Sequence, residues 1–213
     1  MKVVALVPIK MNNTRLPGKN TMLLKNKPLI SYILDTLLQS KYIDDIYVYC
    51  SNEEIKKYIP NNIIYLKRDI KLDKDSTKIN DVIKSFVSDV CADVYLLAHA
   101  TAPFIKIENI DKGLRAILTG NYDSSLAVKK LQSFMWNKNM PNYDLDDIPR
   151  TQDMEPIFIE TCGFYAFLDS VIKKGRRIGE KPYFVEVGDI ESIDIDNKDD
   201  FEFASLILEG VLK

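Results

Sequence analysis

Short apolar runs alternate along most of the chain with segments whose apolar residues recur at helical spacing. The runs predict strands at residues 3–7, 46–50, 63–66, 94–98, 157–168 and 183–187. The helical spacing predicts helices at residues 28–38, 52–58, 78–90, 107–118 and 198–212. This alternation is typical of a three-layer α/β fold, in which helices cover both faces of a mostly parallel sheet.

Residues 132–156 interrupt this pattern, because their Trp, Asn, Pro, Met and Asp residues follow no clear period. Irregular segments of this length within a domain are usually functional or disordered. We therefore expect one domain over residues 1–213, with residues 132–156 as an excursion from the sheet. Phe134 and Trp136 lie in it, and we favour interface or lid packing for them over stacking on a substrate.

The composition argues against several classes of partner. Lys and Arg number 29 against 31 Asp and Glu, so the charge balance gives no case for nucleic-acid binding. No apolar run approaches the roughly 18 residues needed to cross a bilayer, so we expect a cytoplasmic protein without a membrane partner. Cys50, Cys91 and Cys162 are widely spaced, which favours reduced thiols over a disulfide framework or a zinc site.

The segment that follows the first predicted strand concentrates positive charge. Lys10, Arg15 and Lys19 lie between residues 6 and 20, and Gly18 permits close approach of the backbone to a ligand. The segment contains neither GxxxxGK[ST] nor GxGxxG, which argues against a P-loop kinase and a classical dinucleotide enzyme. We interpret it as a loop that holds the triphosphate of a nucleotide; the alternative is a basic surface turn.

Two aspartates near the end of the chain are candidate metal ligands. Asp194 and Asp196 alternate with Ile193 and Ile195, so an extended backbone puts both carboxylates on one side. Such a pair suits Mg²⁺, or Mn²⁺, that also binds phosphate oxygens. The alternative is a polar segment that leads into a helix, with Asp196 or Asn197 as its N-cap.

Four segments, in order along the chain, carry a resemblance to a known family. They are PIKMNNTRLPGKN at residues 8–20, HATAPF at 99–104, RTQDMEPIFIE at 150–160 and SIDID at 192–196. Together they resemble the acylneuraminate cytidylyltransferases, which activate sialic acid and related sugar acids as CMP conjugates and are related to the CMP-Kdo synthetases. The resemblance implies a Rossmann-like nucleotidyltransferase sheet of the nucleotide-diphospho-sugar transferase type, with the excursion helping to form a homodimer.

The resemblance also implies roles for individual residues. Nucleotide contacts fall on Pro8, Lys10, Asn12, Arg15, Lys19, Asn20 and Arg68. Contacts to the acidic acceptor fall on His99, Thr101, Arg150, Gln152 and Tyr165. Metal binding falls on Asp194 and Asp196, and catalysis on these two together with Arg15 and Lys19.

The chain departs from the family pattern in two places. Asn13-Thr14-Arg15-Leu16 stands where the family usually has Gly-Ser-Lys-Gly, so one cation is shifted by a residue. His99 stands where a glutamine is common, and three roles stay open for it: lining the pocket, a structural role, or a general base.

The implied reaction is attack of a sugar-acid hydroxyl on the α-phosphorus of CTP, with release of pyrophosphate and with Mg²⁺ or Mn²⁺ as cofactor. One alternative is a cytidylyltransferase acting on a phosphonate or a phosphorylated alcohol, and another is a nucleotide-sugar-dependent glycosyltransferase. The basic run at residues 173–177 is interpreted as a solvated turn.

Overall fold

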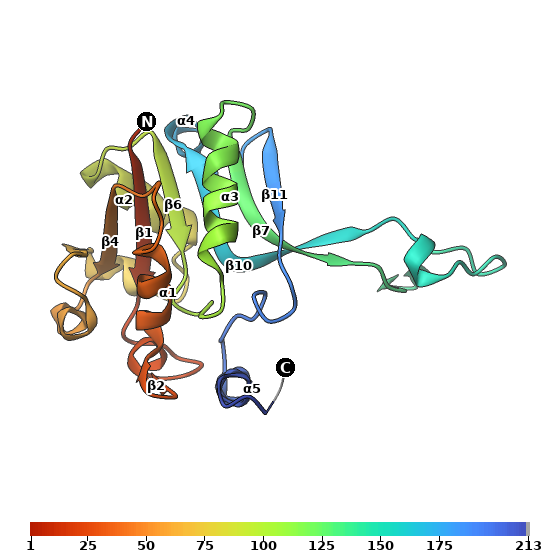
Figure 1. Cartoon of the computed structure of the whole chain (residues 1–213), viewed down its shortest axis with the longest axis horizontal. Helices are drawn as coiled ribbons and strands as arrows, with labels where there is room; N and C mark the ends of the chain where they lie inside the picture. The colour runs from red at the N-terminus through yellow and green to blue at the C-terminus, as the bar shows by residue number, and fades with distance from the viewer. Residues whose placement is uncertain (212–213) are drawn as a thin grey trace.

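A seven-stranded sheet forms the centre of the computed structural model, which describes residues 1–211 (Figure 1). Its strand order is β11-β7-β10-β6-β1-β4-β5. The strands are β1 (Val3–Ile9), β4 (Asp45–Cys50), β5 (Ile64–Lys67), β6 (Val94–Ala98), β7 (Ser124–Leu131), β10 (Ile157–Leu168) and β11 (Pro182–Glu186). All neighbours pair in parallel except β10, which is antiparallel to both β6 and β7. The prediction of a mostly parallel sheet is confirmed.

Alternation along β1 divides the core into two layers. Val3, Ala5 and Val7 belong to an apolar cluster with α1 (Leu29–Leu37) and α3 (Ile107–Leu118). Val4 and Leu6 point to the other face and pack with α2 (Ile79–Asp89) and α4 (Asp169–Lys173). Both faces of the sheet are therefore covered, as the continuous apolar sequence of β1 predicts.

A third, smaller cluster lies beyond the carboxyl ends of the strands. Leu24 and Leu29 pack there against Ile195 and Ala204. These residues come from β2 (Leu23–Leu24), the start of α1, the segment before α5, and α5 itself (Lys198–Leu208), and α5 lies near β2 in Figure 1. The remaining short elements of the core are β3 (Lys27–Pro28) and the 3₁₀ helices η1 (Lys19–Thr21), η2 (Glu53–Tyr58) and η3 (Ile70–Asp73). The third cluster fixes the chain's last segment beside the loop that follows β1.

The predicted strands and helices are found, most of them within two residues of the expected bounds, with three differences. Strand β7 was missed, because Ser124, Ser125 and two lysines leave only a short apolar core to its sequence. The segment at 52–58 is a 3₁₀ helix, and its N-cap is Asn52, whose side chain accepts from the N–H of Glu54. The last helix ends at Leu208, whereas the predicted end, residue 212, lies outside the described residues.

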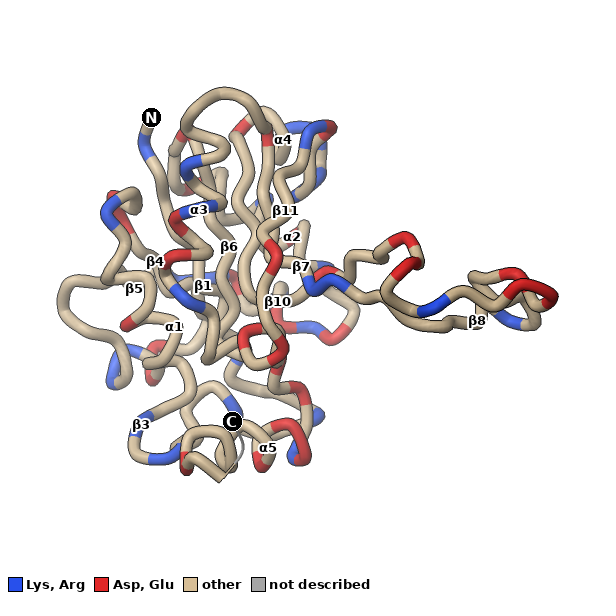
Figure 2. The backbone as a smooth tube through the Cα atoms, turned by 45° about the vertical axis from the view of Figure 1, so that its right-hand side comes forward, with Lys and Arg blue, Asp and Glu red and all other residues tan. Residues whose placement is uncertain are grey.

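The excursion is an arm that extends away from the sheet (Figure 1). Strands β7 and β10 continue past the core as a two-stranded ribbon, with Ile157 paired to Leu131. Beyond it lie β8 (Trp136–Asn137), β9 (Met140–Pro141) and the 3₁₀ helix η4 (Thr151–Asp153). Figure 2 shows positive and negative residues interspersed over the core, with acidic residues gathered toward the end of the arm. Within the described part of the chain, no helix has the length and apolar character needed to cross a membrane.

Candidate active site

The last residues of β1 pair with a neighbouring strand on one side only. Pro8 has no backbone N–H to give to a strand ladder, and β1 pairs with β6 only from Val3 to Leu6. Val7, Pro8 and Ile9 pair with β4 alone, and Pro8 lines one of the cavities described below. Gly18 at φ 70° turns the loop that follows β1 into η1, in a left-handed conformation that glycine adopts without strain.

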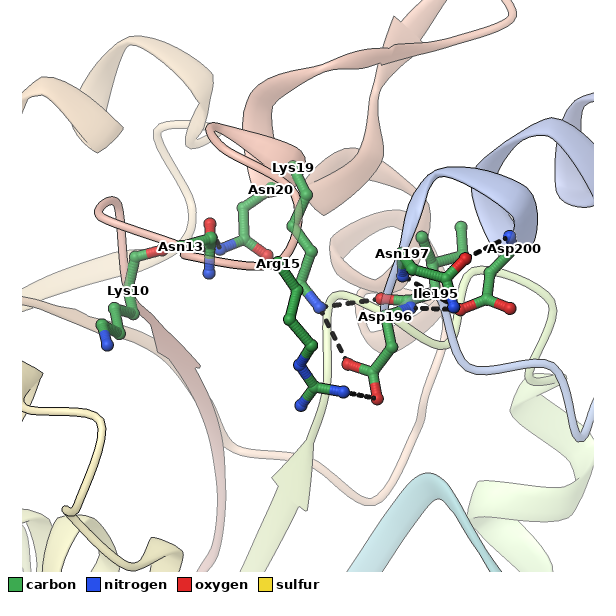
Figure 3. A network of polar contacts seen from close by, with 9 residues as sticks. All are labelled: Lys10, Asn13, Arg15, Lys19, Asn20, Ile195, Asp196, Asn197 and Asp200. Atoms are coloured by element: carbon green, nitrogen blue, oxygen red, sulfur yellow. Dashed lines mark hydrogen bonds and ion pairs between the residues drawn. The ribbon is translucent and has the colours of Figure 1, made fainter.

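A network of cations and one carboxylate joins this loop to the end of the chain (Figure 3). Lys19 is buried, and its Nζ donates to the carbonyl oxygen of Ile195 at 2.8 Å and to Oδ1 of Asp196 at 3.2 Å. Arg15 is exposed and donates from Nη1 to Oδ2 of Asp196 at 2.8 Å. The structure thus brings together Arg15, Lys19 and Asp196, three of the four residues to which the resemblance assigned catalysis.

The backbone around the two aspartates is held from both sides. The N–H of Ile195 donates to the carbonyl oxygen of Thr101 at 2.8 Å, and the N–H of Asp196 donates to Oδ2 of Asp200 at 2.8 Å. Asn197 caps α5, so the N-cap alternative is also correct for this residue. Among residues 1–211, Oδ1 of Asp194 has no hydrogen-bond partner although it is buried. Burying a carboxylate oxygen without a donor costs free energy, and a bound cation would offset that cost.

Two adjoining cavities lie beside this network, and both are lined by Lys10 and Asp75. The first, of about 170 Å³, is also lined by Asn13, Thr14, Arg15, Leu16, Lys19 and Asp196. The second, of about 280 Å³, is also lined by Pro8, Arg68, Leu72, Lys74, Thr77, Ile79, Val82 and His99. Lys10 forms an ion pair with Asp75 across their junction. The cavities therefore connect the cation-rich loop with the ends of β5 and β6.

Asn20 and Asn12 occupy different positions in the loop. Asn20 is buried, and its side-chain amide donates to the carbonyl oxygen of Lys10 at 2.8 Å, so it shapes the loop from within. Asn12 is exposed and lines neither cavity.

Arg68 is held by two residues that sequence reasoning did not assign to the site. Its Nη2 donates to Oδ1 of Asp73 at 2.5 Å, and the hydroxyl of Ser51 donates to Oδ2 of Asp73 at 2.5 Å. Arg68 is buried, and its Nε has no partner among the described residues. Asp73 and Asp75 follow Arg68 at a spacing that could have marked them as its partners, but nothing in the sequence placed that loop over the cavity.

His99 follows β6 and lies edge-on to the ring of Tyr165, with 6.5 Å between ring centroids. Burial lowers the pKa of His99 to about 4, against an opposing effect of Asp194. The imidazole is therefore neutral near pH 7. Burial likewise raises the pKa of Tyr165, and it raises the pKa of the Cys162 thiol to about 12, so neither ionises near neutral pH.

Arg150 and Gln152 do not join this cluster within a single chain. Both lie on the arm, and Nε of Arg150 donates to Oδ2 of Asp153 at 2.7 Å. Arg177, by contrast, lies beside the cluster although its basic run was interpreted as a solvated turn. Its guanidinium lies 4.1 Å from the ring centroid of Tyr165. No motif in the sequence distinguishes it from the other cations of that run.

Comparison with known proteins shows which family the chain resembles in sequence and in structure. A family model described as "Cytidylyltransferase" matches residues 4–159. The chain is 23% identical over 214 residues to the N-acylneuraminate cytidylyltransferase of Streptococcus agalactiae serotype V, covering 94% of this chain and 52% of that protein. It is 33% identical over 117 residues to the CMP-N,N'-diacetyllegionaminic acid synthase of Legionella pneumophila, covering 52% of this chain and 50% of that protein.

The chain thus spans about half the length of the curated relatives it matches. Among solved structures, it is similar to a CMP:2-keto-3-deoxy-manno-octonic acid synthetase complexed with CTP. The TM-score is 0.74 and the identity 15%, and the match covers 100% of both chains. This similarity confirms the Rossmann-like nucleotidyltransferase fold.

Proposed function

The chain belongs to the cytidylyltransferase family, and from that premise we propose that it transfers CMP from CTP to the hydroxyl of an acidic sugar and releases pyrophosphate. The observation that carries this proposal is the network of Lys19, Arg15 and Asp196, which lines one of two cavities that share Lys10 and Asp75. It concentrates phosphate-binding cations next to a carboxylate pair, which is the charge distribution that nucleotidyl transfer needs.

In the proposed reaction, Lys10, Arg15 and Lys19 bind the triphosphate. These cations form ion pairs with Asp75 and Asp196, and their N–H donors are the groups that would bind phosphate oxygens. The cavity lined by Pro8, Arg68 and His99 would hold the nucleoside. The chain provides positioning and charge neutralisation, and no side chain needs to become a covalent nucleophile.

Asp194 and Asp196 suit Mg²⁺ or Mn²⁺. The donor set is hard carboxylate oxygen, and the buried Oδ1 of Asp194 is unpartnered in the described part of the chain. Over the same residues, no group of three or more Asp, Glu, His or Cys side chains is arranged to hold a metal, so the remaining ligands would come from phosphate oxygens. When bound, the metal would offset charge on the α-phosphate and lower the pKa of the attacking hydroxyl.

The acceptor proposed is a sialic-acid-like or other nonulosonic or ulosonic sugar acid. The names of the relatives support it, since they include enzymes of acylneuraminate, diacetyllegionaminate and 3-deoxy-manno-octulosonate. His99, Thr101 and Tyr165 would form the acceptor wall. The alternative acceptor is a phosphonate or a phosphorylated alcohol. We place the reaction in the cytoplasm, where CTP is made, and expect its product to serve cell-surface polysaccharide biosynthesis.

We further propose that the protein is a homodimer formed through the arm. Apolar side chains on the arm are exposed, as expected of a surface that another chain covers; they are Phe134, Trp136, Met140, Leu145 and Ile148. In such a dimer, Arg150 and Gln152 would reach the acceptor site of the second copy. Sedimentation of the wild type against Trp136→Ser at several concentrations tests this, and a monomeric wild type would contradict it.

The function is tested by pyrophosphate release from each of the four nucleoside triphosphates, with Mg²⁺ and a panel of sugar acids and phosphonates. We expect release with CTP and a sugar acid only. A matched pair of variants connects the activity to the site: Asp196→Asn should abolish it, whereas Asp199→Asn, an exposed residue of the first turn of α5, should not. Release without an acceptor, or with phosphonates only, would contradict the proposed acceptor class.

A further inference from the structure

Arg177 lies in the loop between α4 and β11, far in sequence from the cation-rich loop. Its guanidinium stacks over the ring of Tyr165 at 4.1 Å, a cation–π contact. Tyr165 in turn lies edge-on to His99, which follows β6. The charges of Asp194, Arg177, Lys19 and Asp196 all affect the pKa of His99, which indicates that these groups lie near it. Arg177 therefore lies beside the pair of rings formed by Tyr165 and His99.

The guanidinium of Arg177 uses few of its N–H donors in the described part of the chain. Within residues 1–211, its one hydrogen bond runs from Nη2 to Oε2 of Glu160, at 3.4 Å. The same Oε2 accepts the shorter bond of 3.0 Å from the hydroxyl of Tyr165. An arginine offers five N–H donors in a planar fork that matches a carboxylate. An incoming carboxylate could therefore replace the long Glu160 contact and leave the Tyr165 bond intact.

The chemistry of the acceptor determines where such a contact is needed. In the ring form of a 2-keto sugar acid, one carbon carries both the anomeric hydroxyl and the carboxylate. If that hydroxyl attacks beside Asp194 and Asp196, the carboxylate of the sugar acid must lie only a few bonds away, at the acceptor wall formed by His99, Thr101 and Tyr165. Arg150 lies on the arm and pairs with Asp153, so within one chain it does not reach this wall. Arg177 contacts the ring of Tyr165 and therefore lies at the wall.

We propose that Arg177 is a substrate-binding residue that grips the acceptor's carboxylate, stacked in place by Tyr165 and released from Glu160 as the acid binds. This assignment rests on the proposed function, and it makes the arginine of the α4–β11 loop a determinant of acid specificity. Residues of the arm would then contact other parts of the acceptor.

The test compares Arg177→Ala and Arg177→Lys with Arg176→Ala. Arg176 is the adjacent cation, but it is exposed and pairs with Glu180 at 2.5 Å on the surface. The probes are N-acetylneuraminate, N,N'-diacetyllegionaminate and 3-deoxy-manno-octulosonate, and the carboxamide of whichever acid the wild type uses. For each variant we would measure kcat/KM for the acid, the Kd of CTP, the melting temperature, and the ratio of carboxamide Ki to acid KM.

For Arg177→Ala we expect a loss of roughly 10- to 100-fold in kcat/KM for the acid, as for a charge-assisted hydrogen-bond pair. CTP binding should be unchanged, and the preference for acid over carboxamide should disappear. Arg177→Lys should fall in between because it keeps the charge and loses the fork. Arg176→Ala should match the wild type throughout.

Two results overturn the assignment, and they differ. If the wild type uses an acid and Arg177→Ala keeps its preference for acid over carboxamide, Arg177 only braces Tyr165, even if the melting temperature falls. If the wild type uses none of the three acids, the proposed acceptor class fails and the assignment fails with it.

Discussion

Lys19→Met is the substitution whose effect the structure specifies most closely. Methionine keeps the length of the buried side chain and removes its charge. The lost bond to the carbonyl oxygen of Ile195 is a buried, charge-assisted one, worth about 1.5 to 3 kcal/mol. The lost contact with Asp196 adds little, roughly 0.2 to 1 kcal/mol, because that carboxylate is 39% exposed and keeps Arg15.

Burying methionine avoids the cost of desolvating an ammonium group, which shifts the expected total toward the lower end, about 2 kcal/mol. For a domain of this size, that corresponds to a fall of roughly 4 to 8 °C in Tm. The kinetic effect should be larger, because the same ammonium is proposed to bind the triphosphate. We expect kcat/KM for CTP to fall on the order of 100-fold, or about 2.7 kcal/mol of transition-state stabilisation.

The assay combines thermal melting with CTP kinetics at saturating acceptor. Lys25→Met is the matched control, since Nζ of Lys25 also donates to a backbone carbonyl oxygen, that of Leu208 at 2.9 Å, but in an exposed position. The control should change neither quantity appreciably. If Lys19→Met lowers Tm and leaves kcat/KM for CTP near the wild-type value, Lys19 only fastens the loop to the 192–197 segment, and its role at the triphosphate is wrong.

Further substitutions address the other site residues. Asp196→Asn should abolish turnover while the fold is kept, because it removes charge from the proposed metal ligand at near-constant volume. Arg15→Ala should lower kcat/KM for CTP less than Lys19→Met, since Arg15 is 71% exposed and its contact is weakened by solvent. If Arg150 reaches the acceptor of the second copy in the proposed dimer, Arg150→Lys should lower kcat/KM for the acceptor roughly 10- to 100-fold, with CTP binding little changed. For His99, the folded pKa of about 4 lies below the ordinary 6.5, so the unfolded chain binds the extra proton and stability should fall as pH drops from 6.5 to 4.

Each of these has a result that would contradict it. Near wild-type activity of Asp196→Asn in Mg²⁺ would remove the metal assignment, and an unaffected Arg15→Ala would place that residue outside the site. A lower Tm with unchanged acceptor kinetics would leave Arg150 as a brace for Asp153. Denaturant melts from pH 6.5 to 4 on wild type and His99→Gln test the histidine, and equal pH slopes would refute its role.

Local pattern was enough to predict most of the sheet and the cation-rich loop. The apolar run of β1 and the charges of Lys10, Arg15 and Lys19 each lie within a short stretch of sequence, so local patterns are enough to detect them. Strand β7 was missed because its buried Ser124 and Ser125 look polar in sequence, although the core encloses them.

The contacts that complete the site join distant parts of the chain and could not be predicted in the same way. Asp196 lies 177 residues after Lys19, and the family resemblance assigned both to the site without predicting their ion pair. Arg177 carries no local signal, because its partners Tyr165 and Glu160 depend on how the loop after α4 folds back over β10. Arg150 lies in a motif that matches the family, yet its side chain does not reach the site within one chain.

The central claim is tested most directly by ³¹P NMR of CTP incubated with Mg²⁺, the protein and each of the three sugar acids. The account predicts that the triphosphate signals disappear only when an acid is present, and that one phosphodiester signal and pyrophosphate arise in equal amounts. Loss of CTP without acid, inorganic phosphate as the first product, or equal turnover of UTP and ATP would contradict it.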